Sequence, residues 1–565
     1  MKKAYEKYIP FVPIDLPDRT WPEKQITKAP IWCSVDLRDG NQSLIDPMSV
    51  KEKVEFFHTL VDIGVKEIEV GFPSASETEY EFLRTLIEGG HIPPDVTIQV
   101  LVQAREHLIK KTFEAIEGAP NVIFHFYNST STLQRKVVFQ MEMDGIIGIA
   151  VDAAKLIYEL SQPAIAAGMN LRYQYSPESF MGTEMDNAVE ICARVLDELH
   201  ATAEKPVILN LPTTVENCMP NYFADEIEYF IRSLPGRERA IISLHPHNDR
   251  GTGVATAEMG LLAGAERVEA TLFGNGERTG NVDMVTLAMN MYTQGVDPLL
   301  DFSDINKIRD VYERVTKMKI PERQPYVGEL VFTAFSGSHQ DAINKGVHYM
   351  QSSNSPFWEI PYLPIDPADV GRQYEPIIRI NSQSGKGGSA FIMQTYFGFD
   401  LPKAMHPEFG AIVQVETDRV GKELKPDQIY ELFKTNYIDA TAPYQLLRHS
   451  FVEHTEGGVT KVDFNGTLRH TDTEFQVSGS GNGPIDAFFN AIHGQKMDRF
   501  TFVDYKSHAI SRGSDSLAVA YIHLRDKLGQ DIFGVGISPN INLAPLMGIL
   551  SAINREWTAR HNKEN

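Results

Sequence analysis

The sequence predicts an α/β protein in which a (β/α)8 barrel is followed by helical linker subdomains and a C-terminal α+β domain. Short apolar runs rich in β-branched residues recur through the first half of the chain, and the stretches between them space their apolar residues as amphipathic helices do. Eight such repeats are what the barrel requires. An open doubly wound sheet is the alternative, but it carries a GxGxxG motif after its first strand, which this chain lacks. The expected strands cover residues 31–36, 65–71, 96–102, 122–127, 170–175, 206–211, 240–245 and 267–273.

The chain changes character after the barrel. Helical patterns such as those at residues 49–63 and 185–199 alternate with the strands, but this rhythm ends near residue 325. A segment rich in Pro, Gly and Ser then indicates an irregular linker or lid up to residue 388, after which helical patterns resume. We expect an N-terminal extension at 1–30, the barrel at 31–320, linker subdomains at 321–440 and a C-terminal domain at 441–565.

Alternating apolar and polar residues predict strands in the last part of the chain, and two helical stretches lie among them. The glycines at 479–483 are interpreted as a strand-to-helix turn. The strand-like runs lie at residues 457–468, 473–481, 501–510 and 515–524, and the helical stretches near 485–494 and 541–554.

Composition limits the classes of function. The chain has 565 residues, of which 42% are hydrophobic, and 53 Lys+Arg against 75 Asp+Glu give a net charge of −22, which disfavours nucleic acid and anionic membrane as partners. The 3 Cys, without CxxC spacing, indicate neither a disulfide framework nor a cysteine zinc site. The N-terminus has no apolar leader and no apolar stretch of about 18 residues occurs, so we expect a cytoplasmic protein without membrane spans.

Polar residues gather where the expected strands end, which is the face that carries the active site of such barrels. The first strand leads into DLRDGNQ at 36–42, the seventh into HPHND at 245–249 and the eighth into GNGERTGN at 274–281. The candidate residues at these strand ends are Arg38, Asp39, His125, Ser176, Glu178, Thr214, His245, His247 and Asn281.

His245 and His247 form the most informative pair. They are two residues apart on one strand, so their side chains point to the same face, here into the barrel mouth. Two imidazoles and a carboxylate such as Asp39 make a mixed nitrogen and oxygen site, which suits Zn²⁺, Mn²⁺ or a similar divalent ion. Loop histidines that only form hydrogen bonds are the alternative, and the position at a strand end favours the metal.

Other features each keep two interpretations. Arg38 and Asp39 are either a surface ion pair or catalytic groups, and Glu178 is either a solvated carboxylate or a general acid/base. The glycines at 274–280 form either a simple turn or a tight backbone that lets Asn281 approach a metal or substrate. The stretch SGKGG at 384–388 lacks the first glycine of a phosphate loop, so nucleoside triphosphate binding is not expected.

The three motifs DLRDGNQ, HPHND and GNGERTGN, in this order, resemble those of the α-isopropylmalate synthases, a metal-dependent family of (β/α)8 barrels. The resemblance covers nearly the whole chain, and the segmentation matches the family's longer form. It implies condensation of acetyl-CoA with 3-methyl-2-oxobutanoate and water to give 2-isopropylmalate and CoA, the first committed step towards leucine.

The resemblance also implies roles for individual residues. A Lewis acid that polarises the ketone, a cation that offsets the oxyanion and a base for the acetyl methyl agree with the chemistry of the strand ends. Lys386 is a further candidate cation for CoA. The resemblance places Mg²⁺, Mn²⁺ or Zn²⁺ on Asp39, His245, His247 and Asn281, the keto-acid carboxylate on Thr214, the alkoxide on Arg38, and His125, Ser176 and Glu178 around the pocket.

Two linker residues acquire a role only from the resemblance. The family's linker supplies a histidine and a tyrosine to the partner subunit's active site, and these match His339 and Tyr374. Without it, they are a lid histidine and a packed tyrosine. The resemblance thus implies a homodimer with shared active sites, with His339 a candidate base for acetyl-CoA. It also implies that residues 479–484 and 513–516 belong to a domain that binds leucine as an inhibitor.

Several alternatives stay open within this group. Homocitrate, citramalate and methylthioalkylmalate synthases share the metal motifs, although whole-length similarity favours isopropylmalate. 3-Hydroxy-3-methylglutaryl-CoA lyases need a Gly-Cys-Pro loop and biotin-dependent carboxyltransferases carry a biotinyl Met-Lys-Met, and neither motif occurs here. A leucine sensor without catalysis is disfavoured, because it has no reason to keep every metal ligand.

Overall fold

The computed structural model describes residues 3–334, 336–374, 388–420, 424–456, 458–493, 499–510 and 516–564. The chain forms two compact units, the first made of Met1–Phe332 with Pro364–Tyr374 and the second of Thr333–Leu363 with Glu375–Asn565. Lys386 and residues 384–387 and 513–515, which the sequence analysis singled out, lie outside the described residues. Among the described helices, none combines the length and hydropathy that crossing a bilayer requires.

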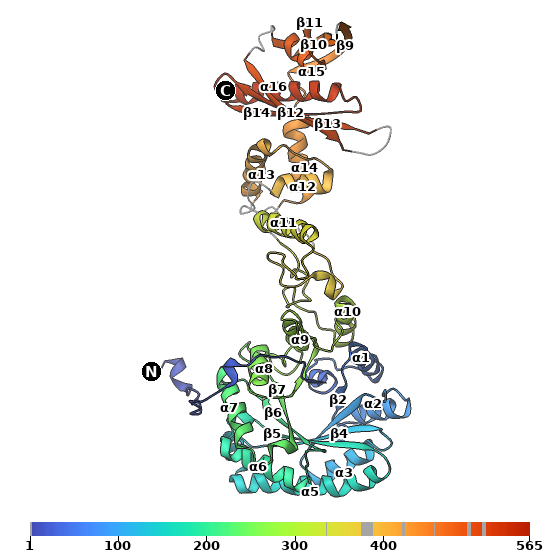
Figure 1. Ribbon diagram of the computed structural model, residues 1–565, viewed down its shortest axis with the longest axis vertical. Coiled ribbons are helices and arrows are strands. Elements are labelled where there is room, and N and C mark those ends of the chain that lie inside the picture. Colours follow the sequence, from blue (N-terminus) through green and yellow to red (C-terminus); the bar gives the residue numbers. More distant parts are fainter. Residues whose placement is uncertain are drawn as a thin grey trace. The chain divides into compact units, whose positions relative to one another are not determined.

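A closed barrel of eight parallel strands forms the first unit (Figure 1). The strands pair in chain order, and the first closes onto the last with Ile31 opposite Arg267. Each of the eight expected strands is present, so the predicted barrel is confirmed. The strands are β1 (Ile31–Ser34), β2 (Glu67–Gly71), β3 (Thr97–Gln103), β4 (Asn121–Ser129), β5 (Asn170–Glu178), β6 (Val207–Thr213), β7 (Ala240–Pro246) and β8 (Arg267–Ala270).

Amphipathic helices surround these strands (Figure 1). In α1 (Val50–Ile63) the Ser49 hydroxyl accepts the amide of Glu52, whose side chain accepts in return from Ser49, and this capping box fixes the start of the helix. The expected helices at 49–63 and 185–199 are confirmed. The other helices of this unit are α2 (Glu77–Glu88), α3 (Glu106–Ala115), α4 (Thr132–Gln134), α5 (Met143–Ala166), α6 (Met185–Glu198), α7 (Pro220–Ser233), α8 (Gly253–Leu262), α9 (Met284–Tyr292) and α10 (Ile305–Thr316).

The first and last strands end earlier than expected. β1 stops at Ser34, and Asp36–Gly40 form a π-helical turn (η3) in which the Val35 carbonyl accepts the amides of Asp39 and Gly40, at 2.9 and 3.1 Å. β8 likewise stops at Ala270 before a short 3-10 turn. Arg38 and Asp39 therefore lie in a π-helical turn after β1, at the C-terminal end of the barrel, and not in the strand itself.

The linker is more regular than its composition indicates. The expected irregular segment contains the 17-residue helix α11 (Gly337–Ser353), so that expectation is wrong at these positions. The Pro-, Gly- and Ser-rich stretches flank the helix, whereas the interior residues, from Gln340 to Met350, include ordinary helix formers. The helices that follow are α12 (Gly388–Phe397), α13 (His406–Val420) and α14 (Pro426–Phe433).

The end of the chain contains two similar βββα arrangements, each a three-stranded antiparallel sheet with one helix. The four expected strands and both helices are present. The first strand of the first sheet and the last strand of the second were not predicted. The elements are β9 (Tyr444–Glu456), β10 (Val459–His470), β11 (Thr473–Gly481), α15 (Pro484–His493), β12 (Phe500–Ala509), β13 (Ala518–Asp526), β14 (Asp531–Ser538) and α16 (Leu543–Glu564).

Glycines let the last helix lie directly on its sheet. A Cβ at Gly534 would lie 2.2 Å from the Gly548 carbonyl oxygen, and one at Gly536 would lie 2.0 Å from that of Ala544. These two glycines explain why β14 lacks the alternating pattern of a strand. The core of the second unit joins α13, α14 and this sheet, because Phe409 and Phe433 share one buried cluster with Val535. The proposed boundary at residue 441 therefore separates parts that share a core.

Candidate active site

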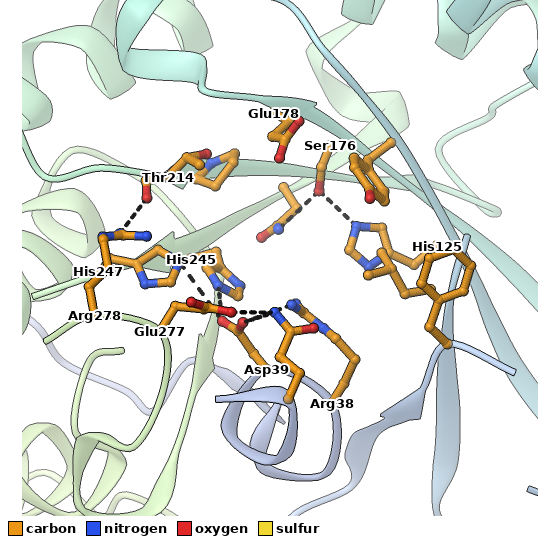
Figure 2. Close-up of a pocket in the computed structure, with 16 residues that line it drawn as sticks. Arg38, Asp39, His125, Ser176, Glu178, Thr214, His245, His247, Glu277 and Arg278 are labelled. Carbon is orange, nitrogen blue, oxygen red and sulfur yellow. Dashed lines mark hydrogen bonds and ion pairs between the residues drawn. The ribbon is translucent and has the colours of Figure 1, made fainter. Parts of the chain in front are cut away.

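A pocket of about 300 Å³ lies at the C-terminal ends of the barrel strands. Figure 2 shows Glu178, Ser176 and Thr214 along one side of it, and Arg38 and Asp39 on the opposite side. Eight of the residues predicted from the strand ends are therefore brought together. The lining residues are Arg38, Asp39, Gln42, Phe72, Leu101, His125, Tyr127, Ser176, Glu178, Asn210, Pro212, Thr214, His245, His247, Glu277 and Arg278.

Four predicted metal ligands converge at one end of this pocket. The Oδ2 atom of Asp39 lies 3.1 Å from His245 Nε2 and 3.8 Å from His247 Nε2. The Asn281 amide donates to the same oxygen at 2.8 Å. All four side chains are buried. This convergence favours the interpretation of His245 and His247 as metal ligands, which stays a prediction.

Two atoms of this group lack partners. His247 Nδ1 and Asn281 Oδ1 are both buried without a hydrogen bond. A buried polar atom without a partner is costly, so these two side chains have capacity for a further ligand. Burial, followed by the positive charge of His245, lowers the pKa of His247 to about 4, which leaves the imidazole neutral and able to donate a lone pair. The donors present therefore fit a divalent cation.

The ionisation of Asp39 suits the same purpose. Burial alone would raise its pKa, but the adjacent Arg38 guanidinium and the hydrogen bond to His245 hold the pKa far below its usual range. Asp39 is therefore a carboxylate at neutral pH. A permanently charged oxygen ligand beside two imidazoles is a set that divalent ions of the first transition row accept.

Arg38 is held from two sides. Its Nε atom lies 2.5 Å from Glu69 Oε1, and its Nη1 atom lies 3.0 Å from Asp39 Oδ1. The side chain is only 12% exposed, so the interpretation as a surface ion pair is wrong. Two carboxylates fix the orientation of the guanidinium, which lines the pocket.

The opposite wall contains a hydrogen-bonded chain. His125 lies between Glu69 Oε2, 2.7 Å from its Nδ1, and Ser176 Oγ, 2.8 Å from its Nε2. Glu178 contacts the Ser129 hydroxyl, and burial raises the pKa of Glu178 despite the charge of Arg38. A carboxyl whose pKa is raised by burial is better suited to exchange protons than a solvated one, which supports the acid/base interpretation.

Five polar residues of the pocket were missed: Tyr127 and Asn210 lie within β4 and β6, and three more lie after strand ends. Gln42 donates to Asp39 Oδ1 at 3.1 Å, and Arg278 donates to the Thr214 carbonyl at 2.6 Å (Figure 2). Glu277 also lines the pocket. The three after strand ends fall inside the motifs DLRDGNQ and GNGERTGN, so their position in a strand-end motif was the available signal.

The glycine-rich loop after β8 is tight. Gly280 has a φ of +91°, and a Cβ there would lie 1.8 Å from the Gly274 carbonyl oxygen. No residue with a side chain fits this position without movement of the loop. The loop brings Asn281 beside Asp39, as the second interpretation of these glycines expected.

Neither of the two linker candidates is among the residues that line the pocket. Tyr374 belongs to the barrel unit, and its hydroxyl is buried without a hydrogen bond. Burial raises the pKa of this tyrosine. His339 belongs to the second unit, on α11, where its ring stacks on Tyr362 with 4.0 Å between centroids. Their roles stay predictions.

Comparison with known proteins identifies the family. Residues 29–312 match the family described as HMGL-like, residues 329–394 the alpha-isopropylmalate synthase post-catalytic domain-like family, and residues 423–556 the LeuA allosteric (dimerisation) domain. The chain is 53% identical to the 2-isopropylmalate synthase of Clostridium acetobutylicum over 98% of this chain and 99% of that one. It is 54% identical to that of Brucella suis, with the same coverage.

The chain belongs to the 2-isopropylmalate synthase family. The predicted family and enzyme class, a transferase that uses acetyl-CoA, are confirmed. The HMGL-like part implies a divalent metal, consistent with the convergence of Asp39, His245 and His247. The C-terminal match supports a dimer.

Proposed function

We propose that the pocket at the barrel mouth condenses acetyl-CoA with 3-methyl-2-oxobutanoate and water, which yields 2-isopropylmalate and CoA. One observation supports this most: three ligand-type side chains converge beside an arginine that two carboxylates hold in place, and two buried polar atoms there lack partners. This is the arrangement that a metal-assisted addition to a ketone requires.

Asp39, His245, His247 and Asn281 would hold the divalent ion. Mg²⁺, Mn²⁺ and Zn²⁺ all accept such a mixed set of nitrogen and oxygen donors. When bound, the ion supplies Lewis-acid polarisation of the keto-acid carbonyl. The chain itself positions these ligands. The tight glycine loop after β8 holds Asn281, and the π-helical turn after β1 holds Asp39.

Arg38 would stabilise the negative charge that develops on the ketone oxygen. Its guanidinium is preorganised by Glu69 and Asp39, so little reorganisation is needed as the charge appears. Thr214 would bind the keto-acid carboxylate. The nearby Arg278, which is ion-paired with Asp249, bonds the Thr214 carbonyl and holds this residue in the wall of the pocket.

Proton transfer would involve the opposite wall. His125 and Ser176 line the keto-acid side, and Glu178 would lie near the acetyl group, where its raised pKa suits a carboxyl that exchanges protons. We propose that a second copy of the chain contributes its His339 and Tyr374 to the site, with that histidine a candidate for the base that deprotonates the acetyl methyl.

Steady-state rates of CoA thiol release with a panel of 2-oxo acids test the substrate. We expect 3-methyl-2-oxobutanoate to give the largest kcat/KM. A larger value with 2-oxoglutarate would indicate a homocitrate synthase, and one with pyruvate a citramalate synthase. Either result would contradict the proposal.

We further propose that leucine inhibits the enzyme by binding to residues 441–565, and that the enzyme is a homodimer. The match to an allosteric dimerisation domain over residues 423–556 supports both. Hydrogen exchange of the full chain with and without leucine should show protection within 441–565. Valine serves as the control ligand. Leucine protection confined to the barrel would contradict the proposed leucine site. A monomeric mass at working concentration, measured by light scattering, would contradict the homodimer.

A further inference from the structure

A second cluster of titratable side chains lies beside the proposed metal ligands, and the proposed reaction gives no role to one of its members, Glu269. Glu69, His125 and Glu269 each bring a ligand-type atom within 4.8 Å of the others, and all three are buried. The centre of the cluster is filled, because the Gln99 amide nitrogen lies 2.5 Å from Glu69 Oε2 and 2.8 Å from Glu269 Oε1. A donor that bonds both carboxylates stands where a cation would sit, so this is not a second metal site.

The Glu269 carboxylate is bonded on both oxygens. Its Oε2 atom lies 2.7 Å from His245 Nδ1, on the side of that ring opposite to Asp39. Fixed N–H groups surround the rest of the carboxylate, so it acts only as an acceptor. These donors are Gln99, Gln174 and Arg267 on Oε1 and Asn210 on Oε2, at 2.7–3.1 Å.

This environment determines which nitrogen of His245 keeps its hydrogen. Because Glu269 can only accept, a hydrogen lies on Nδ1. Nε2 bonds Asp39 Oδ2, 3.1 Å away, and its lone pair becomes available when the proposed ion takes the place of its hydrogen. A carboxylate behind a metal-binding histidine fixes the ring and raises its basicity as a ligand.

The same carboxylate is connected to Arg38. Gln99 donates to both Glu269 and Glu69, and its carbonyl oxygen accepts from Arg267 at 2.8 Å, which fixes the amide's orientation. Glu69 in turn holds the Nε atom of Arg38. A continuous path of direct hydrogen bonds thus runs from His245 to Arg38.

We propose that Glu269 is a positioning residue for the metal site. It holds a hydrogen of His245 on Nδ1 and, through Gln99 and Glu69, fixes the position of this histidine relative to Arg38. The inference rests on the proposed function, because it assumes that the ion binds at His245. Glu269 itself touches neither substrate nor ion.

The test is Mn²⁺ binding by the full-length apo chain without substrates, measured from the free Mn²⁺ signal in electron paramagnetic resonance. Glu269→Gln keeps the shape of the side chain but replaces one acceptor oxygen by an amide donor. We expect its Kd for Mn²⁺ to rise about 10–100-fold, the range typical of lost partners behind metal ligands. Glu269→Asp, which keeps the charge but withdraws it by one methylene, should lie between Gln and the parent.

Glu67→Gln is the matched control. Glu67 is also buried on an inner barrel strand and also bonds Arg267, at 2.6 Å, but its second partner is Arg172 and not a histidine. This variant removes a comparable buried charge from the same network, so we expect it to lower thermal stability and leave the Kd for Mn²⁺ unchanged. Equal weakening in both variants would overturn the positioning role, as would parent-like binding in Glu269→Gln and Glu269→Asp.

A further variant separates this inference from the proposed function. If the ion binds elsewhere, His247→Ala will bind Mn²⁺ as the parent does, and the proposed metal site fails. If His247→Ala loses binding while both Glu269 variants keep it, only the positioning role fails. Should Glu269→Gln not fold, Glu269→Asp compared with Glu67→Gln still decides the question.

Discussion

Two buried clusters at the barrel mouth have similar side chains but differ in how completely they are bonded. The cluster of Asp39, His245 and His247 includes a histidine nitrogen without a partner. The neighbouring amides do not differ, because Asn281 beside this cluster and Gln174 and Asn210 beside the other each have an unbonded oxygen. In the cluster of Glu69, His125 and Glu269, every carboxylate oxygen has a donor. The two clusters have similar residues, so the difference lies in their hydrogen bonds. A cluster that receives a ligand keeps an unbonded donor atom, whereas a cluster that supports such a site has a partner for each of these atoms.

The largest expected effect is that of His247→Ala, which removes a ligand from the unsaturated cluster. Metal-dependent turnover should fall to background while circular dichroism shows a folded chain, because His247 Nδ1 supports nothing else in the described structure. The measurement is CoA release with Mn²⁺ present and after chelation. Retained metal-dependent turnover would remove the distinction between the clusters.

A change in the saturated cluster should act on stability instead. Arg267→Met leaves Glu67 and Glu269 without the guanidinium that bonds both, so we expect a loss of about 3–5 kcal/mol in the free energy of unfolding, measured in urea. Arg239→Met serves as the control, since Arg239 pairs with the largely exposed Asp197. The control should cost less than about 1 kcal/mol. A similar loss in both variants would contradict the prediction.

Arg38→Lys tests the group that joins the two clusters. Lysine keeps the charge but cannot hold the Glu69 and Asp39 contacts in one plane, so the donor is misplaced when the oxyanion forms. We expect kcat to fall about 10²–10³-fold with little change in KM for the keto acid, as for other lost oxyanion donors. A rise in KM alone would instead assign Arg38 to ground-state binding.

The smallest expected effect concerns an unbonded atom outside the pocket. Glu226 on α7 is buried with Oε2 unpaired, and burial, followed by the charge of Asp225, raises its pKa to about 8. Between the unfolded value near 4.5 and this value, the folded chain holds the extra proton, so the free energy of unfolding falls as pH rises. Protonation, and not a metal, explains this orphaned oxygen.

Glu226→Gln should abolish that pH dependence. Between pH 6 and pH 8 the free energy of unfolding of the parent should fall by about 1–2 kcal/mol relative to that of the variant. Only the parent keeps a proton on this side chain, and its binding weakens as the pH rises. Urea titrations at the two pH values measure the difference. Parallel loss of stability in both proteins would show that Glu226 is ionised in the folded chain.

The sequence predicted all of the first cluster but only His125 of the second. Asp39 and His247 follow strand ends, where a barrel places its chemistry, so a positional rule and a family resemblance both pointed to them. The supporting residues were missed because they lie inside strands that read as apolar runs. Charged residues two positions apart on a strand point to the same face of the sheet. This spacing, in Glu67 and Glu69 and again in Arg267 and Glu269, was the feature that could have revealed them.

Other departures have similar physical causes. The π-helical turn that carries Asp39 depends on backbone bonding to Val35, which leaves no mark on the hydrophobic pattern. The strand β14 was missed because Gly534 and Gly536 are required by the helix above them, and glycine is a poor strand former by itself. The hydrophobic pattern of the sequence predicts helices and strands that bury side chains. It does not predict an element whose packing depends on close contacts or hydrogen bonds of the backbone.

The polar layer inside the barrel also bears on how the chain folds. Arg267 bonds Glu67 across 200 residues, and Gln99 bonds Glu269 across 170. During synthesis, Glu67 and Gln99 emerge long before the strand that carries their shared partner Arg267, so a partial barrel leaves part of this polar layer unpaired. We therefore expect strands β1–β7 to stay solvated until β8 arrives and the ring to close in one cooperative event, late in translation.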